Sequence, residues 1–301
     1  MQKIIPFLWF DNNAEEAAKF YTSLFKNSKT GKVVRYTEAS AKASGMPEGS
    51  AMTVPFEIEG YKFTAINGGP VFKFTPAISF FVNSESKDEI QKLWDKLSQD
   101  GKALMPLDKY PFSEKYGWVQ DKYGLSWQLF YSENKVEYKI VPSLMFVGNL
   151  VGKAEEAINY YLSIFKDAKR ITTFRYGAGR EPDKEESIAY ADFLIEGQCF
   201  AIMESAREHK FNFNEAVSFV VNCKDQKEID YYWDKLTEGG DEKAQMCGWL
   251  KDKYGVSWQV VPENLAELMS TPEKSQRVMQ AVLKMKKIDL EELKTAQSVE
   301  V

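Results

Sequence analysis

An internal repeat constrains this 301-residue chain more than any other feature of its sequence. Three blocks recur in the same order at similar separations: residues 14–29 with 154–169, 77–102 with 216–241, and 117–130 with 248–261. The first and last pairs of blocks are identical at 9 of 16 and 9 of 14 positions. A repeat of this length corresponds to one whole domain, so the chain is predicted to be a tandem duplication.

The repeat also predicts the domain boundaries. We expect a first domain, a second domain and a C-terminal helical extension, at residues 1–134, 135–262 and 263–301. In the extension, Val278, Val282 and Met285 share one helical face, and Pro272 stands where a first helical turn tolerates proline. We therefore expect this helix to dock on the second copy.

Inside one copy, the hydrophobic periodicity alternates between strand and helix spacing. Apolar stripes at helical spacing begin at Ala17 and at Ile90, and each stripe follows residues that favour a helix N-terminus. Strands are predicted at residues 4–10, 52–58, 61–66, 77–82, 117–120 and 125–131. The order of one strand, one helix and about three strands occurs twice per copy, which predicts an α+β fold of two βαβββ units in each copy.

Composition excludes several classes of protein. The net charge is −5 and basic residues are interleaved with acidic ones, which argues against a nucleic-acid partner. No apolar run approaches the ~18–20 residues that span a membrane, and the first residues lack the apolar core of a signal peptide. Cys199, Cys223 and Cys247 match no zinc or redox spacing. We therefore expect a cytoplasmic protein without a membrane or nucleic-acid partner.

Two sequence motifs resemble those of a known family. They are Ala14-Glu15-Glu16-Ala17, and Asp121-Lys122-Tyr123-Gly124 with the Leu125-Ser126-Trp127-Gln128 that follows it. They are similar to the PhnB-like branch of the vicinal oxygen chelate superfamily, which includes glyoxalases, bleomycin-resistance proteins and dioxygenases. Members of this branch often carry the inherited name 3-demethylubiquinone 3-methyltransferase. The resemblance covers residues 3–131 and 139–262, and it implies that paired βαβββ units form a curved mixed sheet around a cavity.

In the metalloenzymes of that superfamily, His or Glu side chains on four strands hold a divalent ion. The resemblance places the corresponding positions here at Ile5 or Pro6, Ala65, Ala77 and Gln128, and in the second copy at Val141 or Pro142, Ile202, Ala216 and Gln259. None of these residues is His, Asp, Glu or Cys, and aliphatic or amide side chains do not replace such ligands. We therefore expect no metal ion and no cofactor.

Two alternatives remain open at this point. Glu204 lies near a ligand position and His209 is the single histidine, so a metal site of non-standard composition is conceivable beside the plainer interpretation of His209 as a solvated loop residue. The inherited methyltransferase name finds no support, because Asn67-Gly68-Gly69-Pro70 leads into proline and another strand rather than into a helix. Whether the chain is an enzyme is left open.

A pocket on the concave side of the sheets is the candidate binding site. Strand alternation selects mainly apolar residues with a few amides and hydroxyls, a composition that suits a small organic ligand, although the same residues could fill a closed core. The candidate pocket residues are Phe7, Trp9, Asn67, Ser79, Ser126, Gln128, Ser143, Met145, Glu204 and Gln259. The segment 105–116, which the second copy lacks, is a candidate pocket lid or surface loop.

Three hypotheses of function follow. The first is a metal-independent, glyoxalase-like protein that binds an unidentified small molecule. The second is a metal-dependent lyase, isomerase or dioxygenase with a non-standard site, and the third is a degenerate duplicate that acts in protein interaction. In each case the two copies are expected to pack on each other through a pseudo-two-fold interface, in a monomer or a homodimer.

Overall fold

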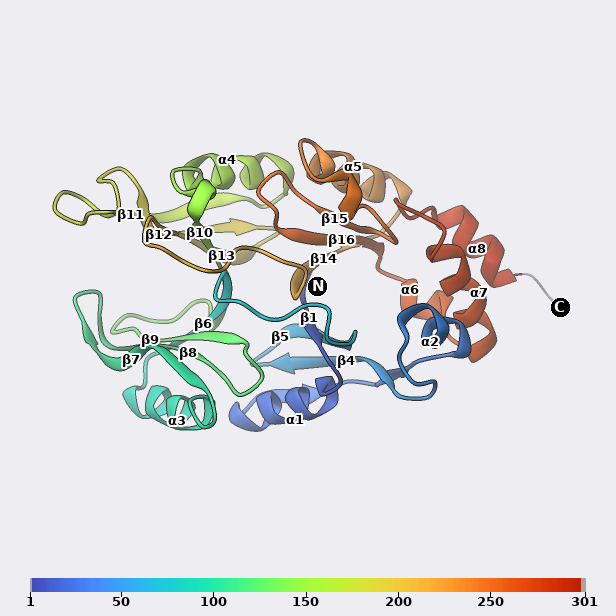
Figure 1. The fold of residues 1–301 in the computed structure, drawn as a ribbon, viewed down its shortest axis with the longest axis horizontal. Helices are drawn as coiled ribbons and strands as arrows, with labels where there is room; N and C mark the ends of the chain where they lie inside the picture. The colour runs from blue at the N-terminus through green and yellow to red at the C-terminus, as the bar shows by residue number, and fades with distance from the viewer. Residues whose placement is uncertain (1, 299–301) are drawn as a thin grey trace. The chain divides into compact units, whose positions relative to one another are not determined.

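The computed structural model describes residues 2–298 of the chain. The chain folds into two compact units: unit 1 is Met1–Lys73 with Asn214–Val301, and unit 2 is Phe74–Phe213 (Figure 1). Each unit contains half of each sequence copy, so the compact units differ from the boundaries expected at residues 134 and 262. The reason is strand pairing, because the first βαβββ half of one copy pairs with the second half of the other.

In unit 1, strand β1 joins the two halves of one mixed sheet. It pairs antiparallel with β14, where Phe7 lies opposite Ser218, and parallel with β5, where Phe7 lies beside Thr64. The strand order is β15 (Trp249–Lys251), β16 (Ser257–Pro262), β14 (Val217–Cys223), β1 (Ile4–Phe10), β5 (Tyr61–Asn67), β4 (Ala51–Ile58) and β2 (Ser28–Thr30), and β3 (Val34–Arg35) also pairs with β4.

Unit 2 repeats this order with one additional edge strand. Its central pair is β10 with β6, where Ser143 lies opposite Ser79. The order is β11 (Lys169–Arg175), β12 (Ile188–Ile195), β13 (Gln198–Ser205), β10 (Ile140–Val147), β6 (Ile78–Ser84), β9 (Ser126–Tyr131), β8 (Ser113–Gln120) and β7 (Lys102–Tyr110). The segment 105–116, considered above as a lid or loop, is part of the β7–β8 edge hairpin.

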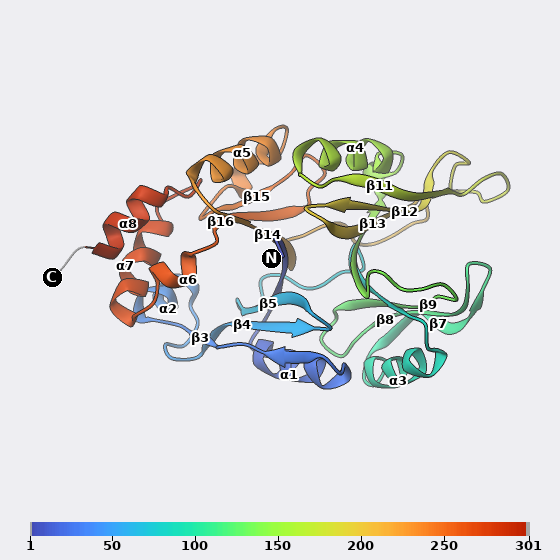
Figure 2. The ribbon, with the colours of Figure 1, turned by 180° about the vertical axis from the view of Figure 1, so that it is seen from behind.

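Helices cover one face of each sheet, as both ribbon views show (Figures 1 and 2). In unit 1 they are α1 (Ala14–Leu24) and α5 (Gln226–Thr237), and in unit 2 they are α3 (Lys87–Leu97) and α4 (Ala154–Ile164). Side-chain caps begin two of them, because Ser86 accepts the N–H of Glu89 and Asp225 accepts that of Glu228. Short 3₁₀ turns occupy Gly148–Leu150 and Glu242–Ala244. We call the sheet face opposite the helices the inner face.

The C-terminal extension is helical and belongs to unit 1. It consists of α6 (Leu265–Leu268), α7 (Pro272–Val282) and α8 (Leu290–Ser298), while residues 299–301 lie outside the described part. The tail contacts the second copy as predicted, through Cys247 N–H donating to Met285 O at 2.8 Å and the Lys287–Asp230 ion pair at 2.8 Å. It also contacts α2 (Glu38–Ser44) of the first copy, since Met279 packs against the buried Tyr36, Ala41 and Met52. No helix within residues 2–298 is long and apolar enough to cross a membrane.

Candidate ligand-binding site

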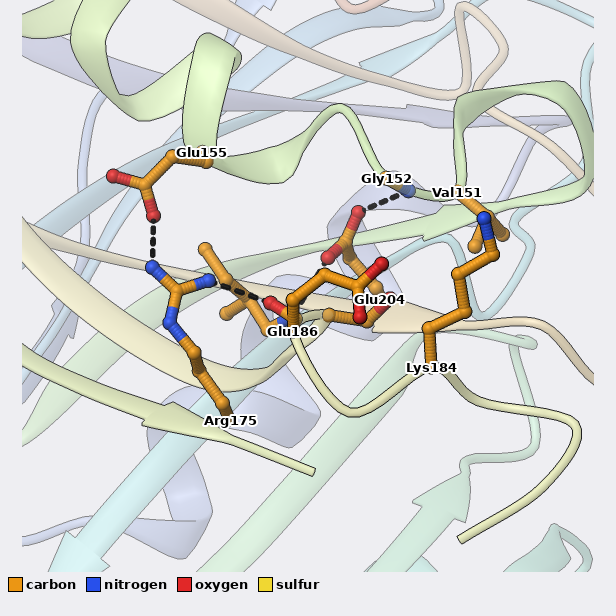
Figure 3. Close-up of a pocket in the computed structure, with 9 residues that line it drawn as sticks. Val151, Gly152, Glu155, Arg175, Lys184, Glu186 and Glu204 are labelled. Atoms are coloured by element: carbon orange, nitrogen blue, oxygen red, sulfur yellow. Dashed lines mark hydrogen bonds and ion pairs between the residues drawn. The ribbon is translucent and has the colours of Figure 1, made fainter. Parts of the chain in front are cut away.

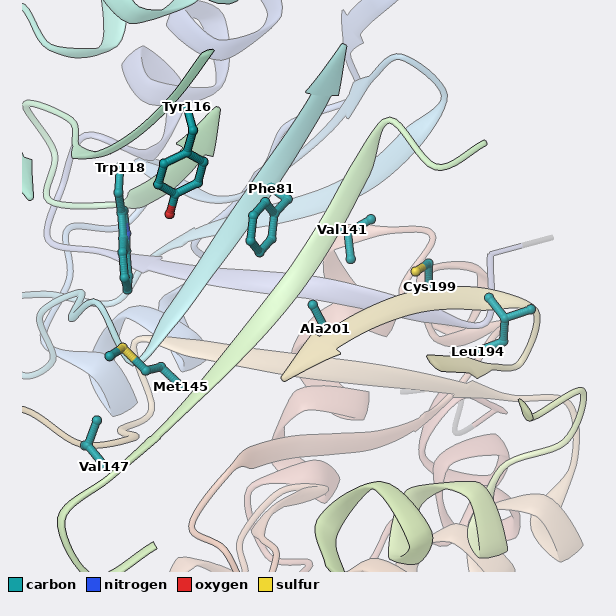
Figure 4. Close-up of a cluster of buried hydrophobic side chains, with 9 residues drawn as sticks. All are labelled: Phe81, Tyr116, Trp118, Val141, Met145, Val147, Leu194, Cys199 and Ala201. Atoms are coloured by element: carbon teal, nitrogen blue, oxygen red, sulfur yellow. The ribbon is translucent and has the colours of Figure 1, made fainter. Parts of the chain in front are cut away.

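The inner face of unit 2 carries a cluster of buried apolar side chains, which we call the inner cluster. Alternation along each strand brings them to one side of the sheet, because successive side chains point to opposite faces. Its buried members are Phe81 on β6, Tyr116 and Trp118 on β8, Val141, Met145 and Val147 on β10, Leu194 on β12, and Cys199 and Ala201 on β13 (Figure 4). Partly buried hydrophobic side chains, among them Tyr110, Tyr138, Tyr190 and Phe211, pack against them.

A line of hydrogen bonds crosses this face. Tyr116 Oη donates to Gln128 Oε1 at 2.5 Å, and Gln128 Nε2 donates to Ser79 Oγ at 2.8 Å. Trp118 Nε1 donates to Ser126 Oγ at 3.0 Å. Burial raises the pKa of Tyr116, which keeps its phenol protonated and able to donate. These polar side chains therefore have fixed orientations.

Two buried polar atoms on the same face have no hydrogen-bond partner within residues 2–298. They are Ser143 Oγ and Asp192 Oδ1. The other oxygen of Asp192 accepts a long hydrogen bond from Tyr190 Oη at 3.4 Å. Burial raises the pKa of Asp192, and hydrogen bonds from its register partner Thr172 and from Tyr190 offset part of that rise. Buried polar atoms are normally satisfied, so both atoms require an explanation.

The same face of unit 1 is occupied by aromatic rings. Phe7 and Trp9 meet Trp249 edge to face at centroid distances of 5.8 and 6.3 Å, and Trp9 meets Phe72 at 5.1 Å. Trp9 Nε1 also donates to Gly69 O at 2.9 Å. The strand registers place Phe7 of unit 1 at the position that Ser143 has in unit 2. Trp9 of unit 1 likewise corresponds to Met145 of unit 2. The inner faces of the two units are therefore different surfaces.

Gln259 of unit 1 repeats the bond that Gln128 makes in unit 2. Its Nε2 donates to Ser218 Oγ at 3.0 Å, and Ser218 is the sequence counterpart of Ser79. The amide therefore keeps a structural partner in both units. Of the ten predicted pocket residues, the structure brings Ser79, Ser126, Gln128, Ser143 and Met145 together in unit 2 and Phe7, Trp9 and Gln259 together in unit 1.

Asn67 and Glu204 are not part of either inner face, because both bind the start of a helix on the opposite side. Asn67 Oδ1 accepts the N–H of Ala14, the first residue of α1, at 2.8 Å. Glu204 Oε1 accepts the N–H of Ala154, the first residue of α4, at 3.2 Å. The two residues are structural counterparts, and each stabilises unsatisfied N–H groups at a helix N-terminus.

A polar pocket of about 390 Å³ lies beside Glu204 (Figure 3). Glu204 uses both oxygens there, since Oε1 also accepts from Gly152 N–H at 2.5 Å and Oε2 accepts from Ile188 N–H at 2.7 Å. Arg175 bridges Glu155 Oε2 at 2.9 Å and the carbonyl of Glu186 at 2.5 Å. Most charged groups of this pocket thus hold the loop before β12 in place.

The side chains of the inner faces and of this pocket do not suit a divalent ion. Gln128 and Gln259 are engaged with serines, and the carboxylate of Glu204 is saturated by backbone N–H groups. His209 Nε2 hydrogen-bonds to Ser205 Oγ at 2.8 Å, and burial lowers the pKa of its imidazole. Over residues 2–298, no three His, Cys, Asp or Glu side chains gather where they could hold a metal ion. The donor set therefore does not fit the metal that related enzymes use.

Sequence reasoning missed several members of this face, above all Tyr116, Tyr190 and Asp192. One signal was available, because the alternation in Ile188–Ile195 puts Tyr190, Asp192 and Leu194 on one side. Comparison of the copies offers a second signal, since the register places Pro55 where the second copy carries Asp192. The missing partner of Asp192 Oδ1 has no signal in the sequence.

Comparison with known proteins connects this fold to two groups. A putative 3-demethylubiquinone-9 3-methyltransferase, PhnB protein, from Bacillus cereus is 45% identical over 44% of this chain and 100% of its own, with a TM-score of 0.40. Glyoxalase I from Zea mays is 13% identical over 88% of this chain and 94% of its own, with a TM-score of 0.52. A mutant of the maize enzyme is 14% identical over 87% of this chain and 93% of its own, with a TM-score of 0.56. No curated protein matches the chain.

The maize enzyme shows the fold, which over most of the chain is that of glyoxalase I. The family model described as 3-demethylubiquinone-9 3-methyltransferase matches residues 2–130 and again residues 138–261. These two matches cover most of the chain and coincide with its two sequence copies. The chain belongs to this PhnB-like family, in a tandemly duplicated form.

Proposed function

We propose that the chain binds a small organic molecule on the inner face of unit 2, without a metal ion. The observation that carries the proposal is the pair of unsatisfied buried atoms, Ser143 Oγ and Asp192 Oδ1, on a face that is otherwise apolar and aromatic. A buried polar atom without a partner costs roughly 1–3 kcal/mol. A ligand that hydrogen-bonds to these atoms would recover that cost.

The surroundings of these atoms support the proposal. Tyr116, Gln128 and Ser79 are held by their own hydrogen bonds, so they offer a preorganised polar edge beside the apolar inner cluster. Apolar lining with a few oriented polar groups is the usual composition of a small-molecule site. Two strongly exposed rings continue the aromatic surface outward: Phe112 meets Tyr116 at 5.0 Å, and Phe174 lies opposite Tyr190.

Unit 1 supplies an internal comparison. Where unit 2 has Ser143 and Met145, unit 1 has the larger rings of Phe7 and Trp9, which pack against Trp249. We therefore assign binding to unit 2 alone. Both sheets are completed by strands of the same chain, so this proposal requires no second subunit.

Methyl transfer, which the family description names, is not part of this proposal. The usual methyltransferase fold needs parallel βαβ units with a glycine-rich turn into a helix. Here Gly68 and Gly69 follow β5 and lead into a loop. We also place the protein in the cytoplasm, because Cys199, Cys223 and Cys247 are all free thiols.

The proposal can be tested by making unit 2 resemble unit 1. The probe is neutral 1-naphthylmethanol, and its dissociation constant is measured by isothermal titration calorimetry. Ser143→Phe introduces the residue that unit 1 carries at this place, and we expect it to weaken binding at least about tenfold. Met145→Trp is a second blocking variant, in case Ser143→Phe does not fold, and circular dichroism establishes folding of both.

Phe7→Leu is the matched control, because it changes the counterpart residue in unit 1. It should leave the affinity for 1-naphthylmethanol within about twofold of the wild type. If the wild type does not bind the probe, or if both folded blocking variants bind it as the wild type does, the proposed site is wrong.

A further inference from the structure

We infer that Asp192 and the rings of Phe81, Tyr138 and Tyr190 recognise the protonated amine of an organic cation. This inference rests on the proposed function and specifies the chemical class of its ligand. The apolar part of such a ligand would lie along the inner cluster, and its ammonium group would meet the carboxylate.

The charge around Asp192 favours a cationic ligand. Over residues 2–298, Asp192 takes part in no ion pair with Lys, Arg or His. Its ionisable neighbours are Tyr190, Tyr138, Cys199 and, beyond Tyr138, Glu137, none of which is cationic. Burial, followed by the charge of Asp192, raises the pKa of Cys199, whereas burial and the hydrogen bond to Glu137 are the main causes that raise the pKa of Tyr138. A half-buried carboxylate without a cation loses part of its hydration uncompensated, and a cationic ligand would supply the missing charge.

The arrangement of the aromatic rings also favours a cationic ligand. Tyr190 Oη donates a hydrogen bond to Asp192 Oδ2. The Tyr190 ring packs edge to face against the Phe81 ring, with 5.7 Å between the ring centroids. Tyr138 packs on the same cluster, and its hydroxyl donates to Glu137 Oε1 at 3.0 Å. Aromatic faces beside a carboxylate attract ammonium groups through the ring quadrupole, and the attraction strengthens when the cation is desolvated.

Ser143 supplies a second unsatisfied polar atom on the same face as Asp192. Ser143 is 1% exposed, and its hydroxyl has no partner on this face. It lies beside Ala201 on β13, and Ala201 in turn lies beside Asp192 on β12. Asp192 and Ser143 are therefore two strands apart on one face. A ligand with an amine and a second polar group can satisfy both atoms, whereas a purely apolar ligand satisfies neither.

The copies show that this carboxylate is specific to unit 2. Pro55 occupies the place of Asp192 in unit 1, and Phe7 occupies that of Ser143. Both unsatisfied atoms of unit 2 are thus absent from the equivalent places of unit 1. Their joint presence in one unit agrees with a single recognition site for one ligand.

The experiment compares two probes of nearly equal shape, 1-naphthylmethylammonium and 1-naphthylmethanol, by calorimetry at pH 7.5. We expect the wild type to bind the ammonium probe about ten- to a hundredfold more tightly, which is the size expected for one charge-assisted hydrogen bond with ring contacts. Asp192→Asn removes the charge at constant shape. It should abolish this preference and leave the affinity for the alcohol within about twofold.

Glu185→Gln is the matched control, since it removes one exposed carboxylate from unit 2 outside the inner face. It should keep the preference, which separates a local contact from a general effect of net charge. Equal affinity for both probes, or a preference that survives Asp192→Asn, overturns the inference. In either of those cases, alcohol binding by the wild type and not by Ser143→Phe means that the proposed function stands while the inference fails. If neither probe binds the wild type, both are wrong.

Discussion

The indole Nε1 of Trp127 donates a hydrogen bond of 2.9 Å to Asp121 Oδ2. The other oxygen, Oδ1, accepts the N–H groups of Tyr123 and Leu125 at 2.8 and 3.1 Å. Trp258 and Asp252 repeat this bond at 2.9 Å in the second copy. The Asp121–Gln128 motif that connects the chain to its family is therefore a turn held by hydrogen bonds to a buried aspartate. Because these residues stabilise the fold, the motif indicates the fold and does not indicate a reaction.

Asp121→Ala is predicted to destabilise unit 2. The substitution removes the acceptor of three N–H donors, two of which are buried, so a loss of roughly 2–4 kcal/mol in the free energy of unfolding is expected. Urea denaturation followed by tryptophan fluorescence measures it. Asp252→Ala should cost a similar amount in unit 1. A loss below about 1 kcal/mol in both variants would contradict the stabilising role of the two aspartates.

Gly68→Ala is predicted to destabilise unit 1 through one specific contact. A Cβ atom at this position would lie 2.1 Å from Cε2 of the Trp9 ring, so the ring must move. Overpacking of this kind costs roughly 1–3 kcal/mol. In a Trp9→Leu background the same substitution should cost much less, and thermal unfolding of the four chains gives the coupling energy. Additive effects of the two substitutions would show that the ring is not what excludes a side chain here.

Glu204→Gln is predicted to lower stability without changing ligand binding. An amide has one acceptor oxygen, so its NH₂ group must face the N–H of either Ile188 or Ala154, and a loss of roughly 1–3 kcal/mol is expected. Asn67→Asp is the reciprocal variant, because Asn67 Nδ2 donates to Ala51 O at 3.0 Å and a carboxylate cannot. Calorimetry with 1-naphthylmethanol should give the wild-type dissociation constant for both. Unchanged melting temperatures would refute the capping role.

Asp192→Asn is predicted to stabilise the chain at neutral pH. Burial raises the pKa of Asp192 above its ordinary value of 3.8, so the folded state holds this proton more tightly than the unfolded state does. Wild-type stability relative to the variant therefore falls as the pH rises from about 4 through the raised pKa. A difference of about 1 kcal/mol corresponds to roughly 2–4 °C in melting temperature. Scanning calorimetry from pH 4 to pH 8 should show the gap widening with pH, and a constant or reversed gap would argue against a strained carboxylate.

Removal of divalent ions is predicted to leave stability unchanged. Gln128 and Gln259 hydrogen-bond to serines, and both oxygens of Glu204 accept backbone N–H groups. An ion present at ~100 times its dissociation constant would add about 2.7 kcal/mol, so a bound metal could not escape detection. Melting curves with and without excess chelator, together with elemental analysis, measure this. A chelator-induced drop with one equivalent of metal per unit would favour a metal-dependent enzyme, and Glu204 and His209 would then be the first residues to substitute.

The candidate site was predictable in part. Strand alternation identified Ser79, Gln128 and Ser143, because the position of a side chain above or below a sheet follows from its place in the strand. It also selected Asn67 and Glu204, which lie on the helix side and cap α1 and α4. An unsatisfied atom such as Asp192 Oδ1 results from all neighbours together, so no pattern along one strand reveals it.

By itself the sequence determined the duplication, the order of the main strands and helices apart from α2, and the family, because each depends on spacing within short segments. Only the tertiary structure decided that β1 pairs with β14 and β10 with β6, so that each compact unit contains half of each copy. The physical reason is that a strand's alternating pattern specifies which side it buries and leaves its partner open. Pairing within one copy or between two copies satisfies the same pattern, and the choice depends on contacts between residues far apart in the chain.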